Sequence, residues 1–162
     1  MNKNWSNTSL VAYSLIPKIG DELDKCVISR VNSSYKSRHL KIGISNEQLI
    51  GEIIELNEQK RKIANLRYIV KHTLSMLSDV DRRVLVARII NKHTFQSIAE
   101  LEKISLRTVF RRLANAEENY AIALKKQGYT EEWFEKEYGN DKYIISIKQR
   151  VSDEKYFIAK NM

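Results

Sequence analysis

The chain of 162 residues carries 28 Lys and Arg against 20 Asp and Glu, which gives a formal net charge of +8. With 43% hydrophobic residues it is too apolar for a disordered tail. Its length suits one domain, or one core with appendages. A folded, basic protein is the class that remains, and the positive surplus directs attention to nucleic acid as a partner.

The residue types present exclude several kinds of site. Cys26 is the only cysteine, so an intramolecular disulfide is impossible and a reducing, cytoplasmic compartment is expected. The histidines, His39, His72 and His93, lack the close pairing of a zinc site. The most apolar stretch, 84–90, is much shorter than the roughly 20 residues of a membrane span. No glycine-rich phosphate loop is present either. From these observations taken together we expect no metal, no cofactor and no membrane partner.

One proline and five glycines favour long helices, and the sequence predicts an all-α fold. In the N-terminal segment, 1–45, a short helix is expected from Leu10 to Ile16, with cap candidates at 7–9. A second helical pattern covers 21–31. The serine-rich stretch 30–41 contains no acid and is interpreted as a basic loop, more in keeping with a solvated linker than with a nucleic-acid arm.

A long amphipathic helix is predicted from 46 to 77. Ser45 and Gln48 resemble a helix cap, and apolar residues then recur at intervals of mostly three and four. The expected apolar face comprises Leu49, Ile50, Ile53, Ile54, Leu56, Ile63, Leu66, Ile69, Val70, Leu74 and Leu77. At roughly 30 residues the helix would be about 45 Å long. It must therefore pack on the N-terminal segment, on a second copy of itself in a homodimer, or on another partner.

Three cap residues, Ser78, Thr94 and Ser105, divide the segment 78–124 into three helices. The residues expected to face inward are Val84, Leu85, Ile89 and Ile90 on the first helix, Ile98, Ala99 and Leu101 on the second, and Leu106, Val109, Phe110, Leu113, Ala116 and Tyr120 on the third. Two short helices joined by a turn of three or four residues are typical of a DNA-binding helix-turn-helix. Ala99 would be the small residue at the helix crossing, Ile104 the buried turn residue and Val109 the anchor.

The opposite face of the third helix is polar. Arg107 and Arg111 are four residues apart, as are Thr108 and Arg112, and Asn115 continues the row. Arginine pairs with guanine and asparagine with adenine in the major groove, while a helix N-terminus suits a phosphate. The predicted DNA-binding residues are Thr94, Ser105, Arg107, Thr108, Arg111, Arg112 and Asn115. Pairing of the arginines with acids such as Glu100 or Glu118 would instead favour an ordinary solvated helix.

The runs 77–90, 94–100 and 104–113 together resemble region four of the sigma-70 family, and also the small sigma-like phage and prophage transcription regulators. The resemblance covers about 77–124. It implies that the helix from Leu106 enters the major groove of a promoter, that Arg107, Thr108, Arg111 and Arg112 read bases or phosphates, and that RNA polymerase is a partner.

Two features depart from that family. Glu102 and Lys103 stand where the family usually has leucine and then glycine before the turn isoleucine, and a left-handed backbone at Lys103 would cost about 1 kcal/mol. No aromatic-rich, basic helix cluster of the kind that melts promoters precedes residue 77. The sequence therefore favours a regulator, or a partial sigma factor that needs a companion, over a self-sufficient sigma factor.

The C-terminal appendage, 125–162, begins where Gly128 stops a helix, and a short capped helix ending at Gly139 is expected next. Its aromatic residues, Tyr129, Trp133, Phe134 and Tyr138, are expected to pack back onto the far end of the preceding helix rather than to form a docking surface. The stretch 143–151 is predicted as a strand or a last helix.

Three alternative functions remain beside transcription regulation. An enzyme such as a recombinase would need a catalytic constellation, and the sequence offers none that we can assemble, so a non-enzyme is expected. A protein-interaction module and a phage DNA-packaging subunit both stay open. Net charge alone does not decide between these functions, because residues 94–124 carry as many acidic as basic side chains. The largest surplus of basic residues lies in 1–45.

Overall fold

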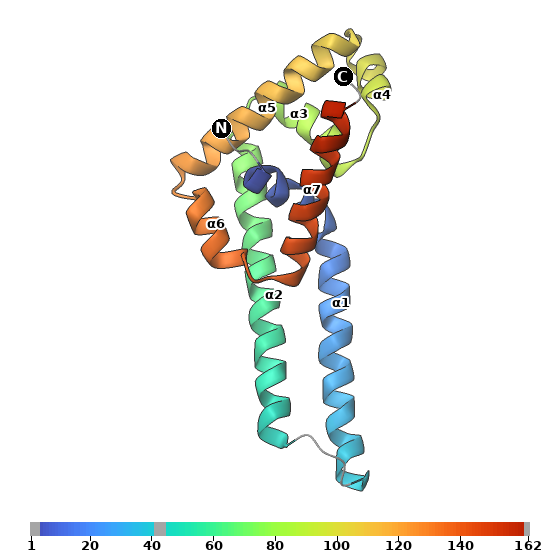
Figure 1. Cartoon of the computed structure of the whole chain (residues 1–162), viewed down its shortest axis with the longest axis vertical. Helices are drawn as coiled ribbons and strands as arrows, with labels where there is room; N and C mark the ends of the chain where they lie inside the picture. Colours follow the sequence, from blue (N-terminus) through green and yellow to red (C-terminus); the bar gives the residue numbers. More distant parts are fainter. Residues whose placement is uncertain (1–3, 41–44, 161–162) are drawn as a thin grey trace. The chain divides into compact units, whose positions relative to one another are not determined.

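The computed structural model describes residues 4–40 and 45–160, with the side chains of 34–40 and 155–160 left out. The all-helical prediction is confirmed, because the described residues form helices and no strand (Figure 1). The elements in chain order are α1 (Asn4–Leu40), α2 (Asn46–Ser75), α3 (Asp79–Leu85), the π-helical turn η1 (Val86–Ile90), α4 (Phe95–Glu102), α5 (Leu106–Lys126), α6 (Glu131–Tyr138) and α7 (Lys142–Lys160). None of the helices in the described ranges combines the length and apolar character that crossing a membrane requires.

The chain divides into two compact units. One unit contains the described residues of 1–14 together with those of 68–162, and the other contains 15–67. Both divisions fall inside a continuous helix, the first in α1 and the second in α2. Each of the two long helices therefore contributes to both units.

The unit 15–67 is a helical hairpin, in which α1 and α2 run antiparallel (Figure 1). Its buried residues include Ile19 and Leu23 on α1 and Ile63 and Leu66 on α2. Two ion pairs join the helices at different heights. The Nε of Arg30 lies 3.0 Å from a carboxylate oxygen of Glu52, and Lys60 pairs with Asp24. Because both ion pairs are exposed, each contributes little to the free energy of unfolding.

Two predictions for the N-terminal segment are wrong. Helix α1 begins at Asn4 rather than Leu10, and it continues to Leu40 through most of the stretch that was interpreted as a basic loop, of which Lys41 lies outside the described residues. The expected cap residues at 7–9 lie within the helix. The hydroxyl of Thr8 donates to the carbonyl of Asn4, and that of Ser9 to the carbonyl of Ser6, both at 2.6 Å. Because these hydroxyls bond their own helix, they do not interrupt it.

The first turns of α1 form part of the core of the larger unit. All six residues from Trp5 to Leu10 are buried, so side chains on every side of the helix are covered here. The ring of Trp5 packs against that of Phe134 at a centroid distance of 6.2 Å. The hydroxyls of Ser9 and Tyr120 share a hydrogen bond of 2.9 Å. Burial raises the pKa of the Tyr120 phenol well above its ordinary value, while the Ser9 bond opposes that rise. The phenol therefore stays neutral and remains available as a hydrogen-bonding group.

The long helix α2 begins as predicted. The Ser45 hydroxyl accepts from the backbone nitrogen of Gln48 at 3.2 Å, and the Gln48 side-chain oxygen accepts from the Ser45 nitrogen at 3.3 Å, which is a capping box. The helix ends at Ser75, two residues before the expected end. Two residues of the predicted apolar face, Ile50 and Ile54, are exposed in the single chain. They lie outside the strip of α2 that faces α1.

The C-terminal appendage is helical throughout its described part. The stretch predicted as strand or helix belongs to α7, with Ile144, Ile147 and Val151 buried along one side. Phe134 and Tyr138 are buried and in ring contact, but the aromatic partner of Phe134 in α1 is Trp5, which sequence reasoning did not pair with it. At Gly139 a Cβ atom would collide with the carbonyl oxygen of Glu135, so only glycine fits where α6 ends.

Candidate nucleic-acid interface

The three predicted caps are present and set the boundaries of the helices that carry the candidate site. Ser78 accepts a hydrogen bond from the backbone nitrogen of Asp81 at 3.2 Å at the start of α3. Thr94 accepts from that of Ser97 at 3.1 Å at the start of α4. The Ser105 hydroxyl accepts from the nitrogen of Thr108 at 3.2 Å, which begins α5 at Leu106 as predicted. Each cap satisfies a backbone donor that the helix itself leaves unpaired.

The connection from α3 to α4 is shaped by a π-helical turn. Helix α3 continues into η1, where the nitrogen of Asn91 bonds the carbonyl of Val86 at 2.9 Å. Arg88 then holds the start of α4 by two contacts. Its guanidinium donates to the His93 carbonyl at 3.0 Å and lies 4.2 Å from the ring centre of Phe95. These contacts fix the direction in which α4 leaves the connection.

Helices α4 and α5 pack through the small cluster that the sequence indicated. Ile98, Ala99 and Val109 are buried together, and Ala87, Phe95 and Ile104 pack against them as half-buried neighbours. The small side chain of Ala99 lets α4 and α5 approach closely, and the buried side chain of Val109 holds α5 against α4. The expected crossing, turn and anchor residues are therefore brought together.

Three residues that were expected to face inward are wrongly placed by the sequence pattern. Leu101 is 65% exposed, and Leu106 and Phe110 are also exposed. Helix α5 packs on the side of α4 that carries Ile98 and Ala99, so Leu101 remains on the outer side of α4. Phe110 keeps one contact, with the ring of Phe95 at a centroid distance of 4.5 Å. An exposed apolar fringe therefore borders the candidate site.

The turn between α4 and α5 contains the left-handed residue that its sequence made costly. Lys103 has φ 52° and ψ 46°, and its backbone nitrogen bonds the carbonyl of Glu100 at 3.3 Å. The nitrogen of Ile104 bonds the carbonyl of Ala99 at 3.0 Å. This geometry closes the end of α4 in the manner normally served by glycine. The lysine therefore adopts the usual turn geometry at an energetic cost.

Lys103→Gly is expected to raise the free energy of unfolding by about 1 kcal/mol, because glycine adopts the left-handed conformation without steric strain. The midpoint and slope of urea unfolding provide the measurement. Lys103→Ala is the matched control, since it removes the same side chain but keeps the Cβ atom. Equal stability of the glycine and alanine variants would contradict the assignment of strain to this backbone.

The two arginines at the centre of the prediction face solvent. Arg107 and Arg111 are exposed, and neither forms an ion pair with any residue in the described ranges. Glu100, one of the acids that would have neutralised them, instead accepts a hydrogen bond from Gln96 at 3.0 Å. Asn115 is exposed one turn farther along α5. Three side chains thus form an outward polar row at the start of this helix.

The remaining predicted residues are engaged within the protein. Arg112 is 34% exposed, and its guanidinium lies 3.9 Å from Glu102, a residue that also pairs with Arg83 at 3.4 Å. The hydroxyls of Thr108 and Ser105 share a hydrogen bond of 2.9 Å. Thr94 is exposed, and its hydroxyl is occupied as the cap of α4. The seven predicted residues therefore do not share one face, and Arg112 turns toward α4.

One cation beside the site was not among the predicted residues. The exposed Lys103 lines a shallow hollow over the turn together with Gln96, Ser105 and Leu106. Its position next to the start of α5 suits a phosphate contact, because backbone N–H groups at a helix N-terminus also attract anions. The sequence does carry a signal for this cation, because Lys103 stands where the sigma-70 family usually has glycine.

Comparisons and metal-ligand geometry add no further assignment. No family model, no curated protein and no solved structure matches this chain. Among the residues that the structure describes, no group of His, Cys, Asp and Glu side chains is arranged to hold a metal ion. The site is therefore defined by its own geometry, which is an N-capped helix whose exposed Arg107 and Arg111 lack an ion-pair partner in the described part of the chain.

Proposed function

We propose that the protein is a sequence-specific DNA-binding transcription regulator in which α4 and α5 form a helix-turn-helix and α5 is the recognition helix. The observation that carries the proposal is the exposure of Arg107 and Arg111 without an ion-pair partner among the described residues. A guanidinium left unpaired on a rigid helix, beside a capped helix start, is suited to a base edge or a phosphate.

The chemistry of the row supports reading of the major groove. Arg107 and Arg111 each present a fork of donors that matches the two acceptors of guanine, and Asn115 matches the acceptor and donor of adenine. Ser105, Lys103 and the free N–H groups at the start of α5 suit the adjacent phosphate. Base contacts would supply discrimination, and phosphate contacts would fix the position of the helix in the groove.

The sigma-like part of the proposal extends from the sequence resemblance. We propose that the regulator acts at promoters together with RNA polymerase, as the resemblance of residues 77–124 implies. Co-purification of the polymerase core with the tagged full chain, in the presence and absence of nuclease, tests this partner. Binding that survives nuclease would support a direct contact, whereas loss of binding would restrict the partner to DNA.

Selection of binding sites from a random double-stranded library tests the DNA-binding function itself. We expect the full chain to enrich a recurrent motif, and its affinity for that motif to fall with rising salt as counterions are released. Affinity for a scrambled site should be weaker by at least about 1,000-fold. Failure to enrich any motif would overturn sequence-specific binding, even if salt-sensitive binding to all DNA were observed.

A protein-interaction module is the second candidate, and the apolar fringe of the site favours it. Leu101, Leu106 and Phe110 expose apolar surface around the same turn that carries Lys103. Apolar residues enclosed by polar ones are typical of protein–protein contacts. If this function held, Leu101→Asp would abolish partner capture, while replacement of Arg107 would leave it intact.

A further inference from the structure

One carboxylate contacts two arginines that come from different helices. Glu102 is the last residue of α4, and its side chain is partly buried. The guanidinium of Arg83 on α3 approaches it twice, with Nε at 3.4 Å from Oε1 and Nη2 at 3.4 Å from Oε2. From α5, Nη1 of Arg112 lies 3.9 Å from Oε2. The two contacts from Arg83 fix the direction of the carboxylate, and Arg112 is the second cation that it holds.

The position of Glu102 within α4 has no local explanation. Carbonyl groups at the end of a helix carry partial negative charge, so a carboxylate in the last position is electrostatically unfavourable. The last turn of α4 contains no basic residue that would offset this charge. Arg83 and Arg112 balance it instead, and both come from other helices. An acid that breaks the local rule and is compensated only by tertiary contacts is a candidate for a functional role.

The contact with Glu102 decides which arginines of α5 point outward. Arg111 and Arg112 are adjacent, and successive residues differ in direction by about 100° around a helix. Arg111 is exposed and has no ion-pair partner among the described residues, whereas Arg112 is half-buried beside Glu102. Arg112 also lies three residues before Asn115, so the two share a side of α5. Without the carboxylate, this long side chain would be free to extend toward the outward row.

An additional free cation beside a recognition helix weakens discrimination between DNA sequences. A positive side chain that neutralises a phosphate adds affinity for any sequence, because it releases a counterion. Base contacts fix the place of the helix on a specific site, so an extra cation must accept whichever phosphate lies within its reach. On other sequences the protein slides and finds the best phosphate. Nonspecific binding therefore gains more from such a cation than specific binding does.

We propose that Glu102, anchored by Arg83, is a positioning residue that holds Arg112 away from DNA and thereby keeps binding to nonspecific sequences weak. This role rests on the proposed DNA-binding function. It leaves Arg107, Arg111 and Asn115 as the residues that decide where the protein binds. Arg112 is expected to contact DNA only when residue 102 carries no charge.

A double-mutant cycle in the full chain tests this role, with a scrambled double-stranded DNA titrated over a range of salt concentrations. Glu102→Gln keeps the size of the side chain and removes its charge. Affinity for the scrambled DNA should then rise roughly five-fold at about 0.15 M salt, and the slope of log K against log salt should steepen by about 0.9, as expected for one added phosphate contact. Arg112→Gln should change this affinity little in the wild type and should cancel the gain in the Glu102→Gln background.

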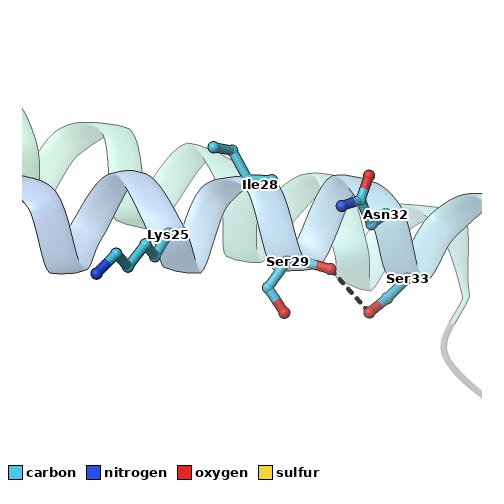
Figure 2. Close-up of a pocket in the computed structure, with 5 residues that line it drawn as sticks. All are labelled: Lys25, Ile28, Ser29, Asn32 and Ser33. Atoms are coloured by element: carbon cyan, nitrogen blue, oxygen red, sulfur yellow. Dashed lines mark hydrogen bonds between the residues drawn. The ribbon is translucent and has the colours of Figure 1, made fainter.

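Two substitutions are matched controls for the cycle. Glu100→Gln removes the same charge from the same helix, but Glu100 accepts a hydrogen bond from Gln96 and pairs with no cation in the described part of the chain. Its effect on the scrambled DNA should be well below that of Glu102→Gln. Figure 2 shows Lys25 extending away from α1, and Lys25 has no ion-pair partner among the residues described. Lys25→Gln removes a positive charge, as Arg112→Gln does, but should have the same effect in both backgrounds.

The dependence of Arg112 on Glu102 is the result that decides. An equal effect of Arg112→Gln in both backgrounds would overturn this role of Glu102. Equal gains from Glu100→Gln and Glu102→Gln would overturn it as well, because net charge would then explain the change. Either result would leave the DNA-binding proposal standing, whereas a wild type that binds neither the selected nor the scrambled DNA would overturn both.

A comparison of neighbouring arginines does not require the Glu102→Gln variant to fold, which circular dichroism checks. In the wild-type background Arg111→Gln should lower the affinity for the selected site about ten-fold or more, the expected effect of losing a bidentate contact with a base. Arg112→Gln should leave that affinity nearly unchanged. Equal losses from the two variants would show that Arg112 contacts DNA while Glu102 is charged, and would overturn the proposed role.

Discussion

Trp5→Ala is expected to lower the free energy of unfolding by about 3–5 kcal/mol, which is large for a residue so close to the start of the chain. Trp5 is 2% exposed, and its ring packs on that of Phe134. Its removal would leave a cavity between α1 and α6 that the surrounding helices fill only in part. Urea unfolding followed by circular dichroism gives the measurement, because it does not depend on tryptophan fluorescence.

The second tryptophan of the chain provides a matched control for this prediction. Trp133 is half-buried and touches the rings of Tyr129 and Tyr138, at centroid distances of 4.8 and 5.8 Å. Because less of its surface leaves water on folding, Trp133→Ala should cost clearly less than Trp5→Ala. The opposite order would mean that the first turns of α1 do not belong to the core of the larger unit.

Replacement of both Arg107 and Arg111 by alanine is expected to have the largest effect on DNA binding. Each arginine should contribute about 1–3 kcal/mol of discrimination, so the double variant should lose more affinity for the selected site than either single variant does. Binding to a scrambled site should fall much less, since base contacts carry sequence information and phosphate contacts do not. Titration of both sites at one fixed salt concentration gives the comparison.

A charge-matched control separates this specific effect from simple loss of positive charge. Arg67 and Arg150 are exposed, lie outside α5, and form no ion pair with any residue in the described part of the chain. Their double replacement by alanine removes the same two charges and should weaken both DNA sites slightly and equally. If the two double variants behaved alike, α5 would contact only the charge of DNA and would not be a recognition helix.

Local features of the structure were the ones that the sequence predicted well. The caps Ser78, Thr94 and Ser105 each bond a backbone nitrogen three residues ahead. Such a bond depends only on neighbouring residues, so a short stretch of sequence is enough to identify it. The position of the turn at Lys103 could be recognised for the same reason, because it lies between two capped helices and is therefore a local property.

Features that depend on distant parts of the chain were missed. Residues 7–9 resemble a helix cap, yet they are buried inside α1 because Tyr120 and Phe134, more than a hundred residues away, pack around this segment. Ile50 and Ile54 match the apolar spacing of α2 but lie outside the strip that α1 covers. Spacing shows that a face is apolar, whereas only the packed neighbour decides which part of that face is buried.

The candidate site shows the same division between local and tertiary information. By itself, the sequence determined the helical class, the starts of α4 and α5, and the row of Arg107, Arg111 and Asn115, because helix periodicity fixes which residues share a side. Only the tertiary structure decided that Arg112 pairs with Glu102 on α4 while Arg107 and Arg111 have no ion-pair partner among the residues that the structure describes. Which arginine pairs with Glu102 depends on how α4 and α5 cross, and the crossing is set by side chains that meet only in the folded protein.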